Sequence, residues 1–491
     1  MKGINSMKHR NTILNLFALA SLALCPMARA VAPPPDGGYP GGNTAEGQNA
    51  LLSLTSGTFN TAVGVFSLLS NTEGNFNTAV GAGALLANVG NLSTVEGVEN
   101  TATGAGALLS NTAGEENTAN GAFALFSNTE GVGNTANGDQ ALFSNTNGTG
   151  NTASGSSAMF SNTSGSENTA TGSFALLRNT IGAFNTAIGG EALSENTEGN
   201  SNTAAGAFSL RSNTTGHDNT ASGFQALNNN TSGNFNTAIG RDALHGNTIG
   251  VDNTANGTGA LVNNTEGNLN TAVGRNALSS NSTGERNTAL GNEALRLNTT
   301  GSDNTAIGSF AGNAVTTASH VIAIGHPGLN VDDSCFIGNI RDHQVGNTAV
   351  SVMIDSFGKL GTMVSSRRFK KEIKPMDKAS EAILALKPVT FHYKTDNTDT
   401  PQFGLIAEDV AEVNPDLVVR DENGEIYTVR YDAVNAMLLN EFLKAHKTVQ
   451  ELKKEIAALT ATVKEQDSKI QKVSDQLELS KPATKVVLKN P

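Results

Sequence analysis

The tripeptide Asn-Thr-Ala occurs sixteen times between Asn43 and Asn304 and constrains this sequence more than any other feature. Successive copies lie 17 residues apart, except for one step of 23 residues from Asn77 to Asn100. A unit this short cannot bury an apolar face alone, so each copy must stack on its neighbours. The repeat therefore predicts that the chain winds into a rod.

The repeat reads N-T-A-x-G-x-x-A-L-x-x-N-T-x-G-x-x, and the copy that begins at Asn168 illustrates it. Ala170 and Leu176 suit a narrow interior, whereas Gly172 and Gly182 permit the backbone conformations of sharp corners, where the asparagines also fall. Seventeen residues are too few for two helices, and glycine, asparagine and threonine oppose helix. We expect two short strands and two turns per repeat, stacked in register. The predicted fold class is mainly β, with a β-solenoid (β-roll) rod.

The first and last copies depart from the consensus, as capping coils should. Leu54 replaces the second asparagine of the first copy, and Ala311-Gly312 stands where the last copy needs Ala-Leu. One further coil is expected to end at Gly325, so the predicted solenoid spans residues 43–325. Because a thin coil lined by alanine and leucine gains most from burial between chains, we expect three chains to share one dry interior.

The charge of the rod limits its partners. Residues 31–364 contain 50 of the 53 glycines, with 8 basic and 24 acidic residues, whereas the part from Ser365 onward has 20 of each. The acidic rod repels nucleic acid and anionic membranes. Aspartate is too sparse in the repeats for calcium-binding coils and the 8 histidines are scattered, so we expect no metal site and no cofactor.

Residues 1–30 have the pattern of a signal peptide. Lys8 and Arg10 precede an apolar stretch over 13–25, and residues 28–30 read Ala-Arg-Ala, as at a cleavage site. The apolar stretch is too short to span a bilayer comfortably. We therefore expect export to the extracellular space or the cell surface, with no transmembrane segment in the mature chain.

The mature chain would begin with a linker rich in proline and glycine, residues 31–42. It would retain a single cysteine, Cys335, so no intrachain disulfide is expected. We expect Cys335 to be buried as a small hydrophobic residue.

The pattern changes after the rod. Residues 326–364 are expected to form a β-rich connector, and residues 365–431 a small α+β domain. The expected elements are a strand, turn and strand over 352–360, a helix over 377–386, a strand over 389–393 and a strand pair around Asn423-Gly424.

A long helix is predicted from near Tyr431, with residues 432–479 as a coiled coil and residues 480–491 as a disordered tail. Its apolar residues are spaced alternately four and three residues apart, with one polar interruption. We call these positions the seam: Leu438, Phe442, Ala445, Val449, Leu452, Ile456, Leu459, Val463, Gln466, Ile470, Val473 and Leu477. Valine and isoleucine alternating with leucine favour two strands. The irregular Phe442 and Gln466 favour three, and this choice stays open from the heptads alone.

From about Ile354 to Leu479 the chain resembles the C-terminal intramolecular chaperone of phage tail spikes. This endosialidase-type, self-cleaving peptidase domain is also found in tail fibres and in a membrane-bound transcription factor. The matching residues are Ser365, Arg368 and Lys370 of an S-D-x-R-x-K signature, a run over 404–410 and the closing helix. The rod also resembles, more loosely, the β-roll heads of trimeric autotransporter adhesins, whose terminal membrane barrel has no counterpart here.

The resemblance implies a domain that trimerises, brings three chains into register and then cuts itself off. It implies that Ser365 is the nucleophile, Lys370 the general base and the Val364-Ser365 bond the cut. A serine hydroxyl needs a base, and a lysine serves as one when burial or neighbouring cations favour its neutral form. Ser366 stands where the family usually has Asp, so a chaperone that is never cleaved stays open as an alternative.

We assign no chemical role to four further residues. His392 is expected to be a surface or packing histidine, and His446 to face solvent on the long helix. Glu408 and Asp409 are expected to be a charge pair at a helix start.

The leading functional hypothesis is an exported, trimeric surface fibre or adhesin-like protein with a C-terminal registration chaperone that cuts itself once. Two alternatives keep the rod but change its use: an array of threonines at the second and thirteenth repeat positions that binds ice, or a structural fibre with an uncleaved chaperone. An enzyme acting on an external polysaccharide is a weaker alternative, because the repeats carry no paired carboxylates in a separate insert.

Overall fold

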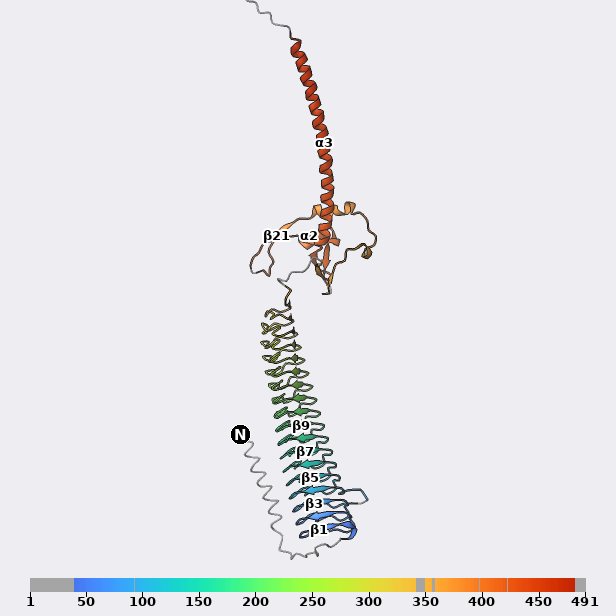
Figure 1. Ribbon diagram of the computed structural model, residues 1–491, viewed down its shortest axis with the longest axis vertical. Helices are drawn as coiled ribbons and strands as arrows, with labels where there is room; N and C mark the ends of the chain where they lie inside the picture. The colour runs from blue at the N-terminus through green and yellow to red at the C-terminus, as the bar shows by residue number, and fades with distance from the viewer. Residues whose placement is uncertain are drawn as a thin grey trace, which may run out of the picture. The chain divides into compact units, whose positions relative to one another are not determined.

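The computed structural model describes residues 39–91, 93–340, 349–355, 358–396, 398–421 and 423–481 (Figure 1). The predicted signal peptide lies outside this part of the chain, as do most of the linker and of the C-terminal tail. The chain divides into two compact units, one up to His343 and one from Gln344 onward. We call them the solenoid unit and the tail unit and describe each by itself.

The solenoid unit contains, among its described residues, one sheet of 18 strands in which consecutive strands pair in parallel (Figure 1). A short 3-10 helix, η1 (Pro40–Gly42), precedes it. The strands are β1 (Thr44–Glu46), β2 (Thr61–Val63), β3 (Thr78–Val80), β4 (Thr101–Thr103), β5 (Thr118–Asn120), β6 (Thr135–Asn137), β7 (Thr152–Ser154), β8 (Thr169–Thr171), β9 (Thr186–Ile188), β10 (Thr203–Ala205), β11 (Thr220–Ser222), β12 (Thr237–Ile239), β13 (Thr254–Asn256), β14 (Thr271–Val273), β15 (Thr288–Leu290), β16 (Thr305–Ile307), β17 (Ile322–Ile324) and β18 (Cys335–Ile337). The predicted β-solenoid is therefore confirmed.

The register of the sheet repeats the sequence. In β8 and β9, Thr169 pairs with Thr186 and Ala170 with Ala187, and every pair from β1 to β16 matches in the same way. The stack continues beyond Gly325 by one strand, β18, which pairs with β17. Like residues therefore form columns that run along the solenoid.

Each coil contains one strand, so the expectation of two was wrong. The second half of the coil passes through single residues in the left-handed region, such as Phe174 (φ 60°) and Leu176 (φ 50°). Its backbone still pairs with the next coil, since the Leu176 N–H donates to the Ala192 carbonyl at 2.9 Å. Alternating left-handed residues break the extended conformation while keeping the hydrogen bonds between coils.

The apolar core closes within one chain. Ala170, Ala175 and Leu176 are 0% exposed, and the equivalent residues of the other full coils are buried in the same way. The expectation that three chains share this interior was therefore wrong. One leucine and two alanines are enough to fill a coil this narrow, and no partner chain is needed to cover them.

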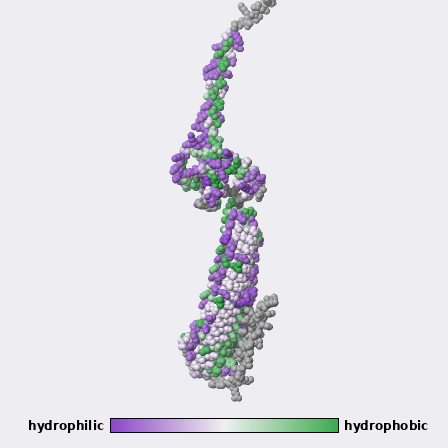
Figure 2. Space-filling model, turned by 180° about the vertical axis from the view of Figure 1, so that it is seen from behind, coloured by the Kyte–Doolittle hydropathy of each residue, from purple (hydrophilic) through white to green (hydrophobic). Residues whose placement is uncertain are grey.

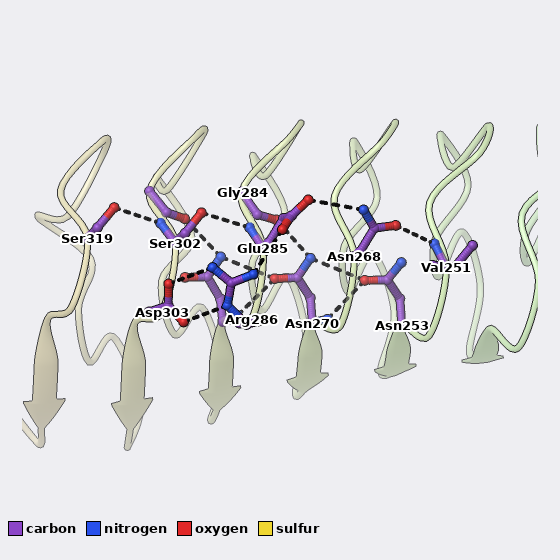
Figure 3. A network of polar contacts seen from close by, with 12 residues as sticks. Val251, Asn253, Asn268, Asn270, Gly284, Glu285, Arg286, Ser302, Asp303 and Ser319 are labelled. Carbon is purple, nitrogen blue, oxygen red and sulfur yellow. Dashed lines mark hydrogen bonds and ion pairs between the residues drawn. The ribbon is translucent and has the colours of Figure 1, made fainter.

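Two columns of asparagines, at repeat positions 1 and 12, are buried at the corners of the coil. Asn168 Nδ2 donates to Asn151 Oδ1 at 3.1 Å and to the Gly182 carbonyl at 2.9 Å. Asn179 Nδ2 donates to Asn162 Oδ1 at 2.7 Å and to the same carbonyl at 2.9 Å. We call these columns the first and second asparagine ladders; Figure 3 shows the first at Asn253 and Asn270. Each amide is satisfied only when the neighbouring coil is in register.

The first glycine of each repeat is required by the close approach of successive coils. Gly172 has φ +133°, and a Cβ atom there would lie 2.6 Å from the carbonyl carbon of Gly189. Any other residue would have to push the two coils apart. The glycine column therefore fixes how closely the coils stack.

Both asparagine ladders end near the C-terminal cap. Asn304 Oδ1 accepts the Val321 N–H at 2.8 Å, which closes the first ladder with a backbone group. The second ladder ends at Asn298, whose buried Oδ1 has no partner among the described residues, and Val315 takes the next place in its column. Leu54 stands before the start of the same ladder, so apolar residues bound it at both ends.

Outside the core, an ion pair joins the last coils. Arg286 Nε lies 2.8 Å from Asp303 Oδ1, and its Nη2 lies 3.0 Å from Oδ2 (Figure 3). The Arg286 hydrogen bonds lower the pKa of the Asp303 carboxyl below its ordinary value.

Cys335 is exposed in β18, so the expectation that it is buried was wrong. The outer face of the last strand leaves its side chain uncovered.

The 23-residue step between Asn77 and Asn100 leaves both ladders intact. The Asn100 N–H donates to Asn77 Oδ1 at 3.0 Å, and Asn111 Nδ2 donates to Asn88 Oδ1 at 2.9 Å. The added residues protrude at the corner that follows Asn88, visible as a projecting loop near β3 in Figure 1. A corner of the coil can thus hold extra chain without disturbing the stack.

The tail unit contains three two-stranded antiparallel sheets among its described residues. Its elements are β19 (Val352–Ile354), β20 (Leu360–Thr362), η2 (Arg367–Phe369), η3 (Asp377–Ala385), β21 (Val389–Phe391), β22 (Gln402–Gly404), α2 (Ala407–Val413), η4 (Pro415–Leu417), β23 (Val418–Arg420), β24 (Ile426–Val429) and α3 (Tyr431–Leu479). The strand pair around Asn423-Gly424 and the helix from Tyr431 are as predicted, whereas the helix expected over 377–386 is a 3-10 helix.

A small core joins the elements of the tail unit. Its buried residues are Val410, Leu417, Val418, Val429 and Met437. Met437 is the contribution of α3, so this helix is anchored at its first turns. None of the described helices combines the length and apolar character needed to cross a membrane.

The second asparagine ladder offers a direct test of what holds the coils. We expect Asn179→Ala to destabilise the solenoid by about 1–3 kcal/mol, because it leaves the buried Asn162 Oδ1 without its donor. Asn179→Asp should cost at least as much, since a carboxylate cannot donate. Urea unfolding followed by circular dichroism measures the effect. Ser164→Ala, at an exposed position of the neighbouring coil, is the control and should leave the unfolding curve unchanged.

Candidate functional site

The two residues singled out as a catalytic pair lie together just after β20. Lys370 Nζ donates a hydrogen bond to Ser365 Oγ at 3.0 Å. The turn η2 brings them together, with the Phe369 N–H donating to the Ser366 carbonyl at 3.0 Å and the Lys370 N–H to the Arg367 carbonyl at 3.1 Å. A hydroxyl and an amine in direct contact can exchange a proton, which nucleophilic catalysis by serine requires.

The surroundings of this pair are basic and open. Arg367, Arg368 and Lys371 flank it, and the Arg368 guanidinium lies 4.6 Å from the centre of the Phe369 ring. Both Ser365 and Lys370 are exposed in the single chain. Cationic residues thus adjoin Lys370 in the sequence, and one chain supplies no burial of the pair. Ser366, in place of the family Asp, brings no carboxylate to the pair.

The other weighed residues lie apart from this chemistry. His392 Nδ1 lies 3.0 Å from Asp399 Oδ1, an exposed pair. Glu408 and Asp409 occupy the first turn of α2, where carboxylates favour a helix start. His446 stacks on Phe442 of the seam with ring centres 6.3 Å apart.

The threonine columns differ in what their hydroxyls do. At the thirteenth position the hydroxyl bonds to the next coil, as Thr163 Oγ1 does when it donates to the Thr180 carbonyl at 3.0 Å. At the second position, as in Thr169, the side chain lies on the outer face of the strand. The hydroxyls of the thirteenth-position column thus bond between coils. Only the second-position column presents threonine side chains on the outer face of the strands.

A polar contact that the sequence did not indicate joins η3 to α3; we call it the η3 clamp. Ser380 is 0% exposed, and its Oγ donates to Glu441 Oε1 and accepts from Asn440 Nδ2 at 2.7 Å. Lys444 Nζ bonds to the Asp377 carbonyl at 2.6 Å and to Glu441 Oε1 at 2.7 Å. Ser380 and Glu441 are 61 residues apart, so no local pattern could have paired them.

The clamp uses Asn440, Glu441 and Lys444 of α3, none of which is a seam position. The seam itself stays uncovered in the described part of the chain, and Figure 2 shows hydrophobic side chains at the surface of α3 beside hydrophilic ones. Leu452 is 50% exposed, Leu459 64% and Ile470 66%. The helix therefore has one face bound to its own domain and one apolar face without a partner.

An open groove lies between two hairpins of the tail unit. It is lined by β19 and β20, which precede the Val364-Ser365 bond, and by β23, β24 and the start of α3, which follow it. Val352, Ile354 and Leu360 of the first hairpin are 64% to 68% exposed. The segments before and after the proposed cut thus face one groove.

Residues 365–419 match the family model described as chaperone of endosialidase. The match begins at Ser365, includes Lys370 and η3, and ends in β23. The chain therefore carries a chaperone-of-endosialidase domain after its β-solenoid, as the sequence predicted. No match was found among curated proteins or among solved structures.

The η3 clamp predicts a pH dependence. Hydrogen bonds from Lys444 first, and from Ser380 second, lower the pKa of Glu441 below its ordinary 4.5. A lowered pKa in the folded state means that this contribution is present above pH 4.5 and is lost as pH falls through the folded value. Thermal unfolding of Glu441→Gln should thus differ from wild type at neutral pH and converge with it in acid.

The control for this experiment is Glu451→Gln, an exposed residue of the same helix. It should melt like wild type at every pH. If Glu441→Gln and Glu451→Gln behave alike, the clamp does not stabilise the tail unit.

Proposed function

We propose that this chain is an exported, trimeric surface fibre or adhesin-like protein. Its C-terminal domain would align three chains and then cut the Val364-Ser365 bond once. The observation that carries this proposal is the 3.0 Å contact between Lys370 Nζ and Ser365 Oγ at the first residues of the chaperone-of-endosialidase match. The β-solenoid supplies the fibre that such a domain would assemble.

In the proposed reaction, Lys370 takes the hydroxyl proton of Ser365, and Oγ attacks the carbonyl carbon of Val364. The peptide bond breaks, its nitrogen becomes the amino group of Ser365 after receiving a proton, and Val364 is held as an ester on Oγ. Water then hydrolyses the ester, which leaves the Val364 carboxylate on the fibre. The net reaction adds one water molecule across the Val364-Ser365 peptide bond, and it requires no cofactor.

Assembly would prepare this site. The pair is exposed in one chain, and a lysine becomes a better base when its charged form is desolvated. Partner chains brought together by the seam could supply that burial. Cutting would then follow alignment of the chains and not precede it.

Three chains are favoured over two by the irregular seam. Phe442 is wide and Gln466 is polar, so neither fits the regular alternation that selects a pair of helices. Because the solenoid core is closed in one chain, the contacts that hold three chains would come from the tail unit and not from a shared interior of the rod.

Export is proposed from the leader sequence alone. Lys8, Arg10 and the apolar stretch over 13–25 have the order of a secretory signal. Intact mass of secreted protein beginning at Val31 would support it.

Substitution of the serine tests the cut. Wild type should yield two fragments that separate before Ser365, whereas Ser365→Ala and Lys370→Met should remain full length because each lacks a partner of the proton transfer. Electrophoresis and intact mass measure this. Ser366→Ala is the control and should still be cut; processing of Ser365→Ala would remove Ser365 from the mechanism, and an uncut wild type would favour a permanent chaperone.

Substitution in the seam tests the assembly. Light scattering of the full chain carrying Ser365→Ala should give three times the chain mass. Adding Leu452→Lys and Leu459→Lys should give single chains, because charged residues at seam positions cannot be buried together. Lys447→Glu, on the side of α3 away from the seam, should leave the mass unchanged. A mass of two chains would contradict the trimer.

A further inference from the structure

The outward side of the last five strands, β14 to β18, carries an unbroken aliphatic column, whereas aliphatic and other residues are mixed in that column along the rest of the sheet. Strand residues alternate between the core and the outer face, so the first and third residue of each strand point outward. We call these ten positions the terminal strand face: Thr271, Val273, Thr288, Leu290, Thr305, Ile307, Ile322, Ile324, Cys335 and Ile337. Its third-residue column is aliphatic at every coil.

The fold does not require aliphatic residues in that column. Leu290, Ile307 and Ile337 are 42% to 48% exposed, so they add little to the core of their own chain. The same column in β5 to β8 consists of polar residues: Asn120, Asn137, Ser154 and Thr171. Strand propensity applies equally to both regions, so it does not account for the change.

The face also lacks charge. None of its ten residues is charged, although residues 31–364 carry 8 basic and 24 acidic groups. Near β14 to β16 the charged residues belong to other columns and pair within the chain, as Arg286 does with Asp303 and Arg275 with Glu293. Near β18, Asp332 Oδ1 accepts the Ser319 N–H and Asp333 lies 3.3 Å from His320, both outside the face. Another chain can cover an aliphatic, uncharged surface without burying an unpaired charge.

We propose that the terminal strand face is a contact surface between copies of this chain, and that the three copies turn this face toward their common axis. This inference rests on the proposed function, because a parallel coiled coil places the copies side by side without stagger. Columns of one copy then meet the same columns of the next at equal height. Coils spaced by ~4.8 Å match only a surface with the same spacing, which another copy provides.

The size of the face decides its role. Ten side chains offer a few hundred Å², well below the roughly 800 Å² per partner of a stable interface. The face therefore cannot gather the copies by itself. It contributes once α3 holds the copies at an effective concentration on the order of millimolar. After the proposed cut, only the surfaces before Ser365, this face among them, stay with the fibre.

Cysteine cross-linking in the full chain carrying Ser365→Ala tests the contact. Cys335 lies on the face, exposed in β18. A short bis-maleimide should link it between copies and yield, within each trimer, one linked pair and one single chain. In a Cys335→Ser background, Thr305→Cys on the face should link in the same way. Thr169→Cys, at the same repeat position in β8, should link at least tenfold less.

A second variant separates contact from assembly. Ile307→Lys with Ile324→Lys should lower Cys335 linking at least tenfold while light scattering still gives three chains. Equal linking at Thr169→Cys and Thr305→Cys, or no linking in a protein of three-chain mass, would overturn this inference and leave the proposed function intact. A single-chain mass before cross-linking would overturn the proposed function instead.

Discussion

The burial of two asparagine amides in every full coil is the constraint on which the solenoid depends. A buried amide without partners costs about 1–3 kcal/mol, and here the partners of Asn168 and Asn179 lie in the neighbouring coil as well as on Gly182. A shift of one residue between coils would leave all of them unpaired. The ladders thus select a single register, and that register places alanine over alanine and leucine over leucine.

The two units solve the problem of apolar surface in opposite ways. The solenoid closes its core within one chain, with Ala175 and Leu176 fully buried. The tail unit leaves apolar surface open along the seam of α3 and on the β19–β20 hairpin. The proposed association between chains would therefore use the tail unit and outward faces, and not the interior of the solenoid.

Much of this could be predicted from the sequence, and the failures have physical causes. Strict repetition predicted the coil, its columns and the corner asparagines, and the heptads predicted α3 to its last residue. The second strand was wrong because Phe174 and Leu176 adopt left-handed conformations that no local residue preference indicates. The pair Ser365 and Lys370 came from a family signature. Ser380 and Glu441 were missed because only the tertiary fold brings them together.

The insertion between Asn77 and Asn100 shows that one corner of the coil can take additional residues, while both asparagine ladders keep the register of the neighbouring coils. Two kinds of variation are thus open to such a chain. Gaining or losing whole coils would lengthen or shorten the solenoid in steps of ~4.8 Å. Inserting residues at the corner that follows Asn88 would instead place one distinct surface loop at a single position along an otherwise uniform solenoid.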